Sequence, residues 1–291
     1  MKPFTAVAGA ICLLSVTVHT QQPPQPQAVN AALRYWMAFA VLQDPSASAA
    51  TADLLARVAE GSAPWDEGRL GAILDANAQS LDIMERASAL RSCDWGLEYE
   101  LGPNAPIPHL ARARVLGRLA VLSGMRLAAR GQISEAVDRW LAAIRFSRHL
   151  AQGGTLISLF SAQSILVPTL RALANETSRL SADSRANVAA VVRMLPETAF
   201  DWPDAMRLEE SVLATGVRLK LVPNVTTQDL GALRTAMPQI SDAMQMSPDR
   251  ARTALAGIKL GSLPYPSPIK VNDQRAVIRA ARQRVLDAVT Q

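Results

Sequence analysis

Apolar residues recur once per helical turn along most of this chain, most clearly between His109 and Leu150. In the second half of that stretch, apolar or small residues stand at offsets 0, 3, 4, 7, 11 and 14 from Ile133, which is one face of a helix. The first half repeats the pattern from Leu116 to Leu127. Gly131 lies where the first helix should end, because glycine adopts the left-handed cap conformation cheaply. The stretch therefore predicts two amphipathic helices joined near residues 129–132.

Similar patterns predict further helices on both sides of this pair. The helix that begins near Leu156 is the most apolar, with Arg171 as its single charge, so we expect it at the centre of the bundle with a kink at Pro168. Short connections favour antiparallel neighbours. The predicted fold is therefore all-α, an irregular array of antiparallel helical hairpins. The further helices are expected over about 28–43, 47–59, 64–91, 156–175, 181–195, 204–221, 228–237, 247–258 and 272–289.

Composition agrees with this fold class. Of the 291 residues, 49% are hydrophobic, which is enough to bury a sizeable core and excludes disorder for most of the length. Only 13 residues are aromatic, and runs of β-branched residues are scarce, so the chain favours helix over sheet.

The predicted hairpin resembles a tetratricopeptide repeat unit, in which small residues let paired helices approach closely. The resemblance rests on small and aromatic residues at matching spacing, namely Gly124, Gly131, Ala136, Trp140 and Ala143. The hairpin departs from that pattern at Ala120, where the first aromatic usually stands, and at Arg148, where the closing proline usually stands. A shift of 34 residues finds no second copy, since it places Ser158 and Leu170 at the small positions. The resemblance implies an array that is only partly tetratricopeptide-like.

A looser resemblance covers about a fifth of the chain. The motifs Cys93-Asp94-Trp95 and Pro108-His109-Leu110, followed by residues 131–149, are similar to an arrangement in an uncharacterised family of exported bacterial helical proteins. It implies export and a helical fold, and it brings no activity or functional residues.

The N-terminus resembles a secretory signal peptide over residues 1–20. Lys2 supplies the positive start, Phe4 to Val18 is uncharged and mainly apolar, and a polar stretch follows. The apolar run is short for a membrane span, which needs about 20 residues. Its end, Val18-His19-Thr20, is a poor cleavage site, so an uncleaved N-terminal membrane anchor stays as the alternative. We expect an exported protein, periplasmic or extracellular, with membrane contact only through such an uncleaved segment.

The rest of the chain divides by composition. A Pro/Gln-rich linker over 21–27 precedes an all-helical domain over 28–258, and a Pro-rich linker over 259–268 leads to a C-terminal amphipathic helix over 269–291. The apolar side of that last helix is mostly alanine and valine, which favours docking on the bundle over lying on a membrane.

Charge is unevenly distributed although the net charge is only +5. Residues 44–100 hold eleven acids and four arginines, whereas residues 110–150 hold eight arginines and two acids. One interpretation is neutralisation between neighbouring helices. The other is a basic groove for an acidic partner, either a protein or an acidic envelope component. Nucleic acid is excluded as that partner, because no aromatic residues interleave with the arginines and the chain is expected to be exported.

Stacked hairpins usually bind partners on their concave side. The predicted contact residues are Arg114, Arg118, Trp140 and Arg145. The first functional hypothesis is therefore an exported helical binding or scaffold protein of the bacterial cell envelope. A purely structural envelope component is not separated from it by the sequence, and the oligomeric state is not fixed.

Residues 92–108 form the longest non-helical stretch and suggest a competing enzyme hypothesis. A hydrolase-like pocket framed by this loop would use Cys93, Asp94, Glu98 and His109. No metal or other cofactor is predicted, because the mature chain has too few regularly spaced histidines and cysteines. The structural interpretation is that Trp95 and Leu97 close one edge of the core.

Two further features are predicted to be structural. The first helix is the most aromatic, and Tyr35, Trp36, Met37 and Phe39 are expected to anchor it in the core. The adjacent carboxylates Glu209 and Glu210 are expected at the solvated surface.

Overall fold

The computed structural model describes residues 30–45, 48–260 and 263–290, so the predicted signal peptide and the linker over 21–27 lie outside the described part of the chain. No strand occurs among the described residues, which confirms the all-α prediction. The elements are α1 (Ala31–Val41), α2 (Ala49–Ala59), α3 (Glu67–Ala76), α4 (Ala78–Ser88), η2 (Tyr99–Asn104), α5 (His109–Ala129), α6 (Ile133–Ala151), α7 (Leu156–Glu176), η3 (Thr177–Arg179), α8 (Ala182–Arg193), α9 (Trp202–Arg218), α10 (Thr227–Gln245), α11 (Pro248–Leu255) and α12 (Pro268–Thr290).

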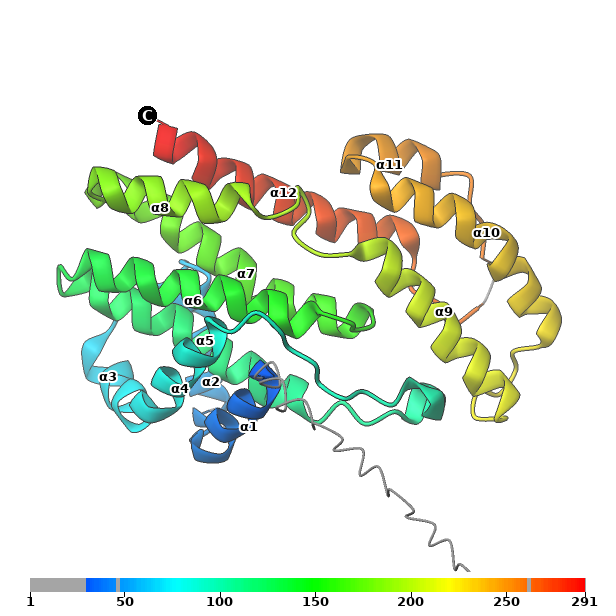
Figure 1. The fold of residues 1–291 in the computed structure, drawn as a ribbon, viewed down its shortest axis with the longest axis horizontal. Helices are drawn as coiled ribbons and strands as arrows, with labels where there is room; N and C mark the ends of the chain where they lie inside the picture. Colours follow the sequence, from blue (N-terminus) through cyan, green and yellow to red (C-terminus); the bar gives the residue numbers. More distant parts are fainter. Residues whose placement is uncertain (1–29, 46–47, 261–262, 291) are drawn as a thin grey trace, which may run out of the picture.

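Helices α5, α6 and α7 form the centre of the molecule, each packed against the other two (Figure 1). Their facing positions are filled by fully buried aliphatic side chains such as Leu116, Ile144 and Leu166. Among the described residues, the segment Leu156–Arg179 is the one long and apolar enough to cross a membrane, but 72% of its most apolar window is buried inside the protein. Its apolar sequence is therefore accounted for by its central position, as the sequence predicts for this helix.

Close helix packing at the centre depends on two glycines of α5. A Cβ atom at Gly124 would lie 2.3 Å from the indole nitrogen of Trp140 on α6, and one at Gly117 would lie 2.3 Å from Ile165 on α7. The Trp140 indole donates a hydrogen bond of 3.1 Å to the Val121 carbonyl. The predicted two helices are thus present and tightly packed, while their tetratricopeptide-like character stays a prediction.

The prediction of a single helix over 64–91 is wrong, because this segment forms two helices, α3 and α4, separated at Asn77. The Asn77 side chain is buried, accepts a hydrogen bond from the Gln43 amide and donates to the carbonyls of Gln43 and Ile73. These bonds join the break to the end of α1, and the turn lets α4 pack along α1. A tertiary contact of this kind leaves no periodic signal in the sequence.

Helices α9, α10 and α11 form a smaller group, drawn in yellow and orange in Figure 1, and α12 passes from this group across α7 and α8. The prediction that the helix over 228–237 stops at residue 237 is wrong, because α10 continues through Pro238 to Gln245. Ile240 and Met244 beyond the proline are buried, so their packing compensates for the lost backbone hydrogen bond.

The C-terminal helix docks on the bundle, where α12 packs against α7, α8 and α11. Arg275 of α12 is almost fully buried and donates hydrogen bonds to Asn272 and to the Met246 carbonyl. The Pro-rich stretch before α12 is packed on the protein at Tyr265, which is buried and whose hydroxyl donates to the Met206 carbonyl.

Candidate functional site

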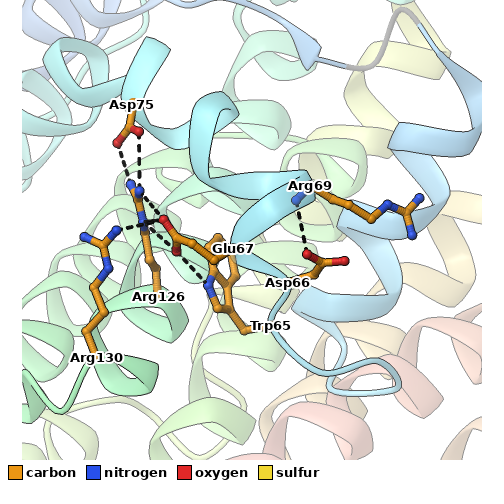
Figure 2. Close-up of polar contacts among 7 residues, drawn as sticks. All are labelled: Trp65, Asp66, Glu67, Arg69, Asp75, Arg126 and Arg130. Atoms are coloured by element: carbon orange, nitrogen blue, oxygen red, sulfur yellow. Dashed lines mark hydrogen bonds and ion pairs between the residues drawn. The ribbon is translucent and has the colours of Figure 1, made fainter.

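Several arginines of the central helices are neutralised by the acidic N-terminal helices. Arg126 of α5 lies between Glu67 and Asp75 of α3, bonded to Asp75 at 2.6 Å, and Arg130 reaches Glu67 at 2.7 Å (Figure 2). The Trp65 indole donates to the same Glu67 carboxylate at 3.0 Å. Hydrogen bonds from Arg126 lower the pKa of Glu67 to about 2. The interpretation that the two oppositely charged segments neutralise each other is confirmed at this contact.

A second contact repeats the arrangement one helix further on. Arg139 of α6 approaches Asp82 at 3.5 Å and Glu85 at 3.3 Å, both on α4. Arg112 instead donates to the Phe39 carbonyl at 2.6 Å. Half of the eight arginines in residues 110–150 are therefore occupied by intramolecular partners.

Replacing Arg126 with methionine tests the contact with α3. The arginine side chain is only 13% exposed, and its loss would leave Glu67 and Asp75 as neighbouring negative charges without their shared cation. We expect the melting temperature to fall by roughly 2–4 °C at low salt, with a smaller fall at high salt. The matched control is Arg57→Met, whose exposed pair with Asp53 should change the melting temperature by no more than about 1 °C. Equal shifts for the two variants would contradict the assignment.

The remaining four arginines, Arg114, Arg118, Arg145 and Arg148, form no ion pair with a described residue. Three of the predicted contact residues are therefore free cations. The prediction for Trp140 is wrong, because this side chain is 0% exposed and its indole nitrogen is bonded inside the α5–α6 contact. It supports the core and cannot meet a partner at the surface.

Arg118 lies in a groove between α2, α5, α7 and α12, which we call the α7 groove. Its volume is about 590 Å³, within the range of ligand sites. Gln163 forms part of the wall, and its side-chain amide nitrogen donates a 2.8 Å hydrogen bond to the Gln274 side chain of α12. The side-chain oxygen Oε1 of Gln163 has no hydrogen-bond partner among the described residues. Apolar side chains form much of the remaining wall, namely Val121, Phe160, Val167, Pro168, Pro266 and Val271.

Three cationic side chains, Arg118, Arg171 and Lys270, line the α7 groove against one carboxylate, that of Glu60. None of these four groups forms an ion pair of 4 Å or less with a described residue. A cleft with a predominance of one charge and low-dielectric walls concentrates its field on an entering ligand. The α7 groove therefore favours a ligand that is both acidic and partly apolar.

The cations are spread along the groove. Phe160 and Arg171 are eleven residues apart on α7, which is about 16 Å of helix. Arg118 of α5 lies between Phe160 and Arg171 along the groove, because the preceding residue, Gly117, packs against Ile165 in the middle of that part of α7. Gln274 of α12 bonds to Gln163 near the start of α7, and α12 also contacts η3 after the end of α7, so the two helices run in the same direction. Lys270 precedes Gln274 by about one turn and therefore lies near Phe160.

Arg145 lies in a different hollow of about 960 Å³. Its lining includes Arg148 and His149 near the end of α6, and Arg91 from the segment after α4. The start of α9 forms another wall and contributes Asp201 and Asp204. This hollow is mixed in charge, in contrast to the α7 groove. The predicted contact surface is thus divided, with Arg118 in one hollow, Arg145 in the other and Arg114 exposed and lining neither.

The loop over 92–108 does not bring its candidate catalytic residues together. His109 is buried and neither ring nitrogen has a hydrogen-bond partner, whereas Glu98 is exposed. The Asp94 carboxylate is also exposed and accepts from the Gly96 amide. Burial raises the pKa of the Cys93 thiol to about 12, so the thiolate is disfavoured at neutral pH. The described side chains of this loop contain no paired acid and base.

The loop instead connects distant parts of the fold. The Trp95 ring stacks on His109 with centroids 4.4 Å apart, and its indole donates to the His149 carbonyl at 2.8 Å. Further along, Gly102 in η2 has a positive φ and packs against Gly216 of α9, where a Cβ would lie 3.1 Å from the Gly216 amide nitrogen. These contacts agree with the predicted structural role of the loop.

The prediction that Glu209 is a solvated surface residue is wrong. Its carboxylate accepts a 3.2 Å hydrogen bond from the Leu156 amide at the start of α7, and burial raises its pKa. Glu210 lies on a different side of α9 and pairs with Arg234 at 3.2 Å. The free amides at the start of α7 explain why a carboxylate is stable there.

Sequence reasoning missed Arg171, Lys270 and Gln163 as groove residues. A signal was present in one case, because Arg171 is the single charge in the most apolar helix. Lys270 and Gln163 lie in the same groove only because α12 packs on α7, which the sequence pattern does not predict.

The described residues contain no group of three or more His, Cys, Asp or Glu side chains that could hold a metal ion. The fold and site thus define a helical bundle with a basic, partly apolar groove. Known protein-family models, curated proteins and solved structures give no match to this chain.

Proposed function

We propose that the protein is an exported helical binding protein of the cell envelope, and that its α7 groove receives an acidic, partly apolar segment of a partner protein. The observation that carries the proposal is the separation of the basic residues into two sets. Arg126, Arg130 and Arg139 are neutralised inside the molecule, whereas Arg118, Arg171 and Lys270 are unpaired around one apolar groove. Arg114, Arg145 and Arg148 are unpaired as well, but only Arg118, Arg171 and Lys270 line one partly apolar groove, which is the arrangement that suits an external acidic ligand.

The spacing of the cations favours a linear segment over a compact anion. A ligand with one acidic group would meet one cation and leave the others unpaired along about 16 Å of α7. A helix or extended peptide with acidic residues on both sides of apolar ones would meet all three and cover Phe160 and Val167. Charge complementarity would then guide association, and the apolar wall would slow dissociation.

The test uses two dye-labelled synthetic peptides, one of alternating glutamate and leucine and a matched one of lysine and leucine. Binding to the purified full chain is measured by fluorescence polarisation. We expect the acidic peptide to bind and the basic one not to bind. Changing Arg118 and Arg171 together to glutamine should weaken binding of the acidic peptide by about tenfold or more. Because neither arginine forms an ion pair, the melting temperature should be unchanged.

The control is the double change of Arg114 and Arg148 to glutamine, which removes the same charge outside the α7 groove. Its affinity for the acidic peptide should stay close to that of the unmodified protein. Equal weakening by both double variants would show that binding depends only on net charge and would contradict the proposal. Equal binding of both peptides would contradict it as well. Export is tested separately by fractionating cells that express the full chain.

A further inference from the structure

The exposed side of α1 contains a continuous apolar stripe. Leu33, Trp36, Met37 and Val41 are 66%, 37%, 61% and 38% exposed, and Ala40 lies between them on the same side. Their spacing of three and four residues makes one continuous stripe. The prediction that the aromatic and large residues of this helix anchor the core is therefore wrong for Met37, whereas Trp36 is partly exposed and its ring also packs edge-on against those of Phe39, Trp95 and His109.

The opposite face of α1 accounts for its fixed position. Tyr35 and Phe39 are buried, and the Tyr35 hydroxyl is hydrogen-bonded to Nδ1 of His149 at 2.8 Å. The helix is thus held rigidly while its apolar stripe faces outward. Charged groups of both signs flank the stripe. Arg34 is exposed on α1 itself and Arg112 of α5 bonds to the Phe39 carbonyl, while Asp44 is exposed after the end of α1 and Asp94 is exposed beside its N-cap, Asn30.

We propose that this face of α1 lies on the surface of a lipid bilayer, with its apolar side chains at the boundary between headgroups and acyl chains. Tryptophan and leucine on one side and arginine beside them are the composition that suits this boundary. The inference rests on the export in the proposed function and on the anchor alternative for residues 4–18. It does not depend on what the α7 groove binds.

The chain preceding α1 argues for this occupant. Phe4 to Val18 is an uncharged, mainly apolar run, and only residues 19–30 separate it from Ala31. Twelve residues span at most about 40 Å when fully extended. With residues 4–18 held in a bilayer, α1 is confined close to the membrane, and the high local concentration lets even a short apolar face bind.

A second copy of the chain is a weaker candidate for the same face. A stable interface takes about 800 Å² and roughly 20–30 residues from each partner. The stripe belongs to one helix of 11 residues and offers four large exposed side chains. A bilayer imposes no such minimum area, because the anchor supplies most of the association.

The experiment reconstitutes the full chain into vesicles of phosphatidylethanolamine and phosphatidylglycerol with brominated acyl chains, which quench nearby tryptophan. Of the five tryptophans, Trp95, Trp140 and Trp202 are buried and Trp65 is half-buried with its indole bonded to Glu67, so Trp36, the most exposed, should account for most of the quenching. We expect the quenching to be lost in Trp36→Phe. It should be strongly reduced in a double variant with Leu33→Ser and Met37→Ser.

The matched control is Met194→Ser, which removes a side chain that is 76% exposed at the end of α8 and should leave the quenching unchanged. All these positions are exposed, and far-UV circular dichroism checks that each variant folds. Quenching that persists in Trp36→Phe would overturn the proposal. Disulfide-linked dimers of Met37→Cys without lipid quenching would also overturn it and identify a second copy as the occupant. Peptide binding in the α7 groove, measured on the same variants, reports separately on the proposed function.

Discussion

Acidification from about pH 7.5 to about pH 4.5 is expected to destabilise the protein by about 5 kcal/mol, through His109 and His149. Burial lowers the pKa of both imidazoles to about 4. For His149, the positive charges of Arg148 and Arg145 act in the same direction. Each imidazole titrates near pH 6.5 in the unfolded chain.

The sign follows from the order of these values. Because the folded pKa is below the unfolded pKa, the unfolded chain binds protons first as the pH falls. The stabilisation is complete above about pH 6.5 and is lost as the pH falls from there toward about 4. Each histidine contributes about 2–3 kcal/mol of that loss at pH 4.5. Urea unfolding followed by far-UV circular dichroism at a series of pH values measures it.

A His109→Phe variant separates the two histidines. A phenyl ring can keep the stacking on Trp95 and needs no hydrogen bond, and neither His109 ring nitrogen has a partner to lose. We expect equal or higher stability at neutral pH and roughly half the acid sensitivity of the unmodified protein. A pH profile parallel to that of the unmodified protein would show that His109 does not titrate on unfolding.

Replacing Trp140 with alanine should cost about 3–5 kcal/mol, the range for truncating a large buried aromatic side chain. The indole is fully buried between α5 and α6, and the change also removes the hydrogen bond that it donates to the Val121 carbonyl. Chemical unfolding at neutral pH gives the free energy. The informative comparison is with Gly124→Ala, alone and combined with the tryptophan change.

In the unmodified protein, a methyl group at position 124 would lie 2.3 Å from the Trp140 indole, so Gly124→Ala should destabilise by about 1–3 kcal/mol. In the Trp140→Ala background the space is open, and the same change should stabilise by up to about 1 kcal/mol through helix propensity. Gly231→Ala in α10 is the control, since nothing lies within 4 Å of that position and it should stabilise in both backgrounds. Additive effects at positions 124 and 140 would contradict a close approach there.

The sequence predicted the helices because their apolar faces repeat once per turn, and α5, α6 and α7 illustrate this well. It failed where a single tertiary contact decides the outcome. Asn77 ends α3 through bonds to Gln43, 34 residues away, and α10 passes through Pro238 because Ile240 and Met244 are buried beyond it. Periodicity contains no information on either contact.

For the candidate site, residue type was a better guide than position. The predicted contact residues Arg114, Arg118 and Arg145 form no ion pair with a described residue, which leaves that prediction open. Trp140 was placed at the surface although its spacing from Gly124 implied tight packing. The α7 groove itself could not be predicted, because Arg118, Arg171 and Lys270 come from three helices that meet only in the folded chain.

The loop over 92–108 also governs how the molecule behaves as a mechanical unit. It begins beside α1, where the Ala31 amide donates to the Ser92 carbonyl. Its Trp95 ring packs among other aromatic rings, and its Gly102 contacts Gly216 of α9. In Figure 1 this teal segment extends from the blue helices to the yellow ones. Besides the contacts of α9 with α7, the loop thus gives the α9–α11 group a second connection, to the first helix, so we expect the two ends to lose their structure in one cooperative step.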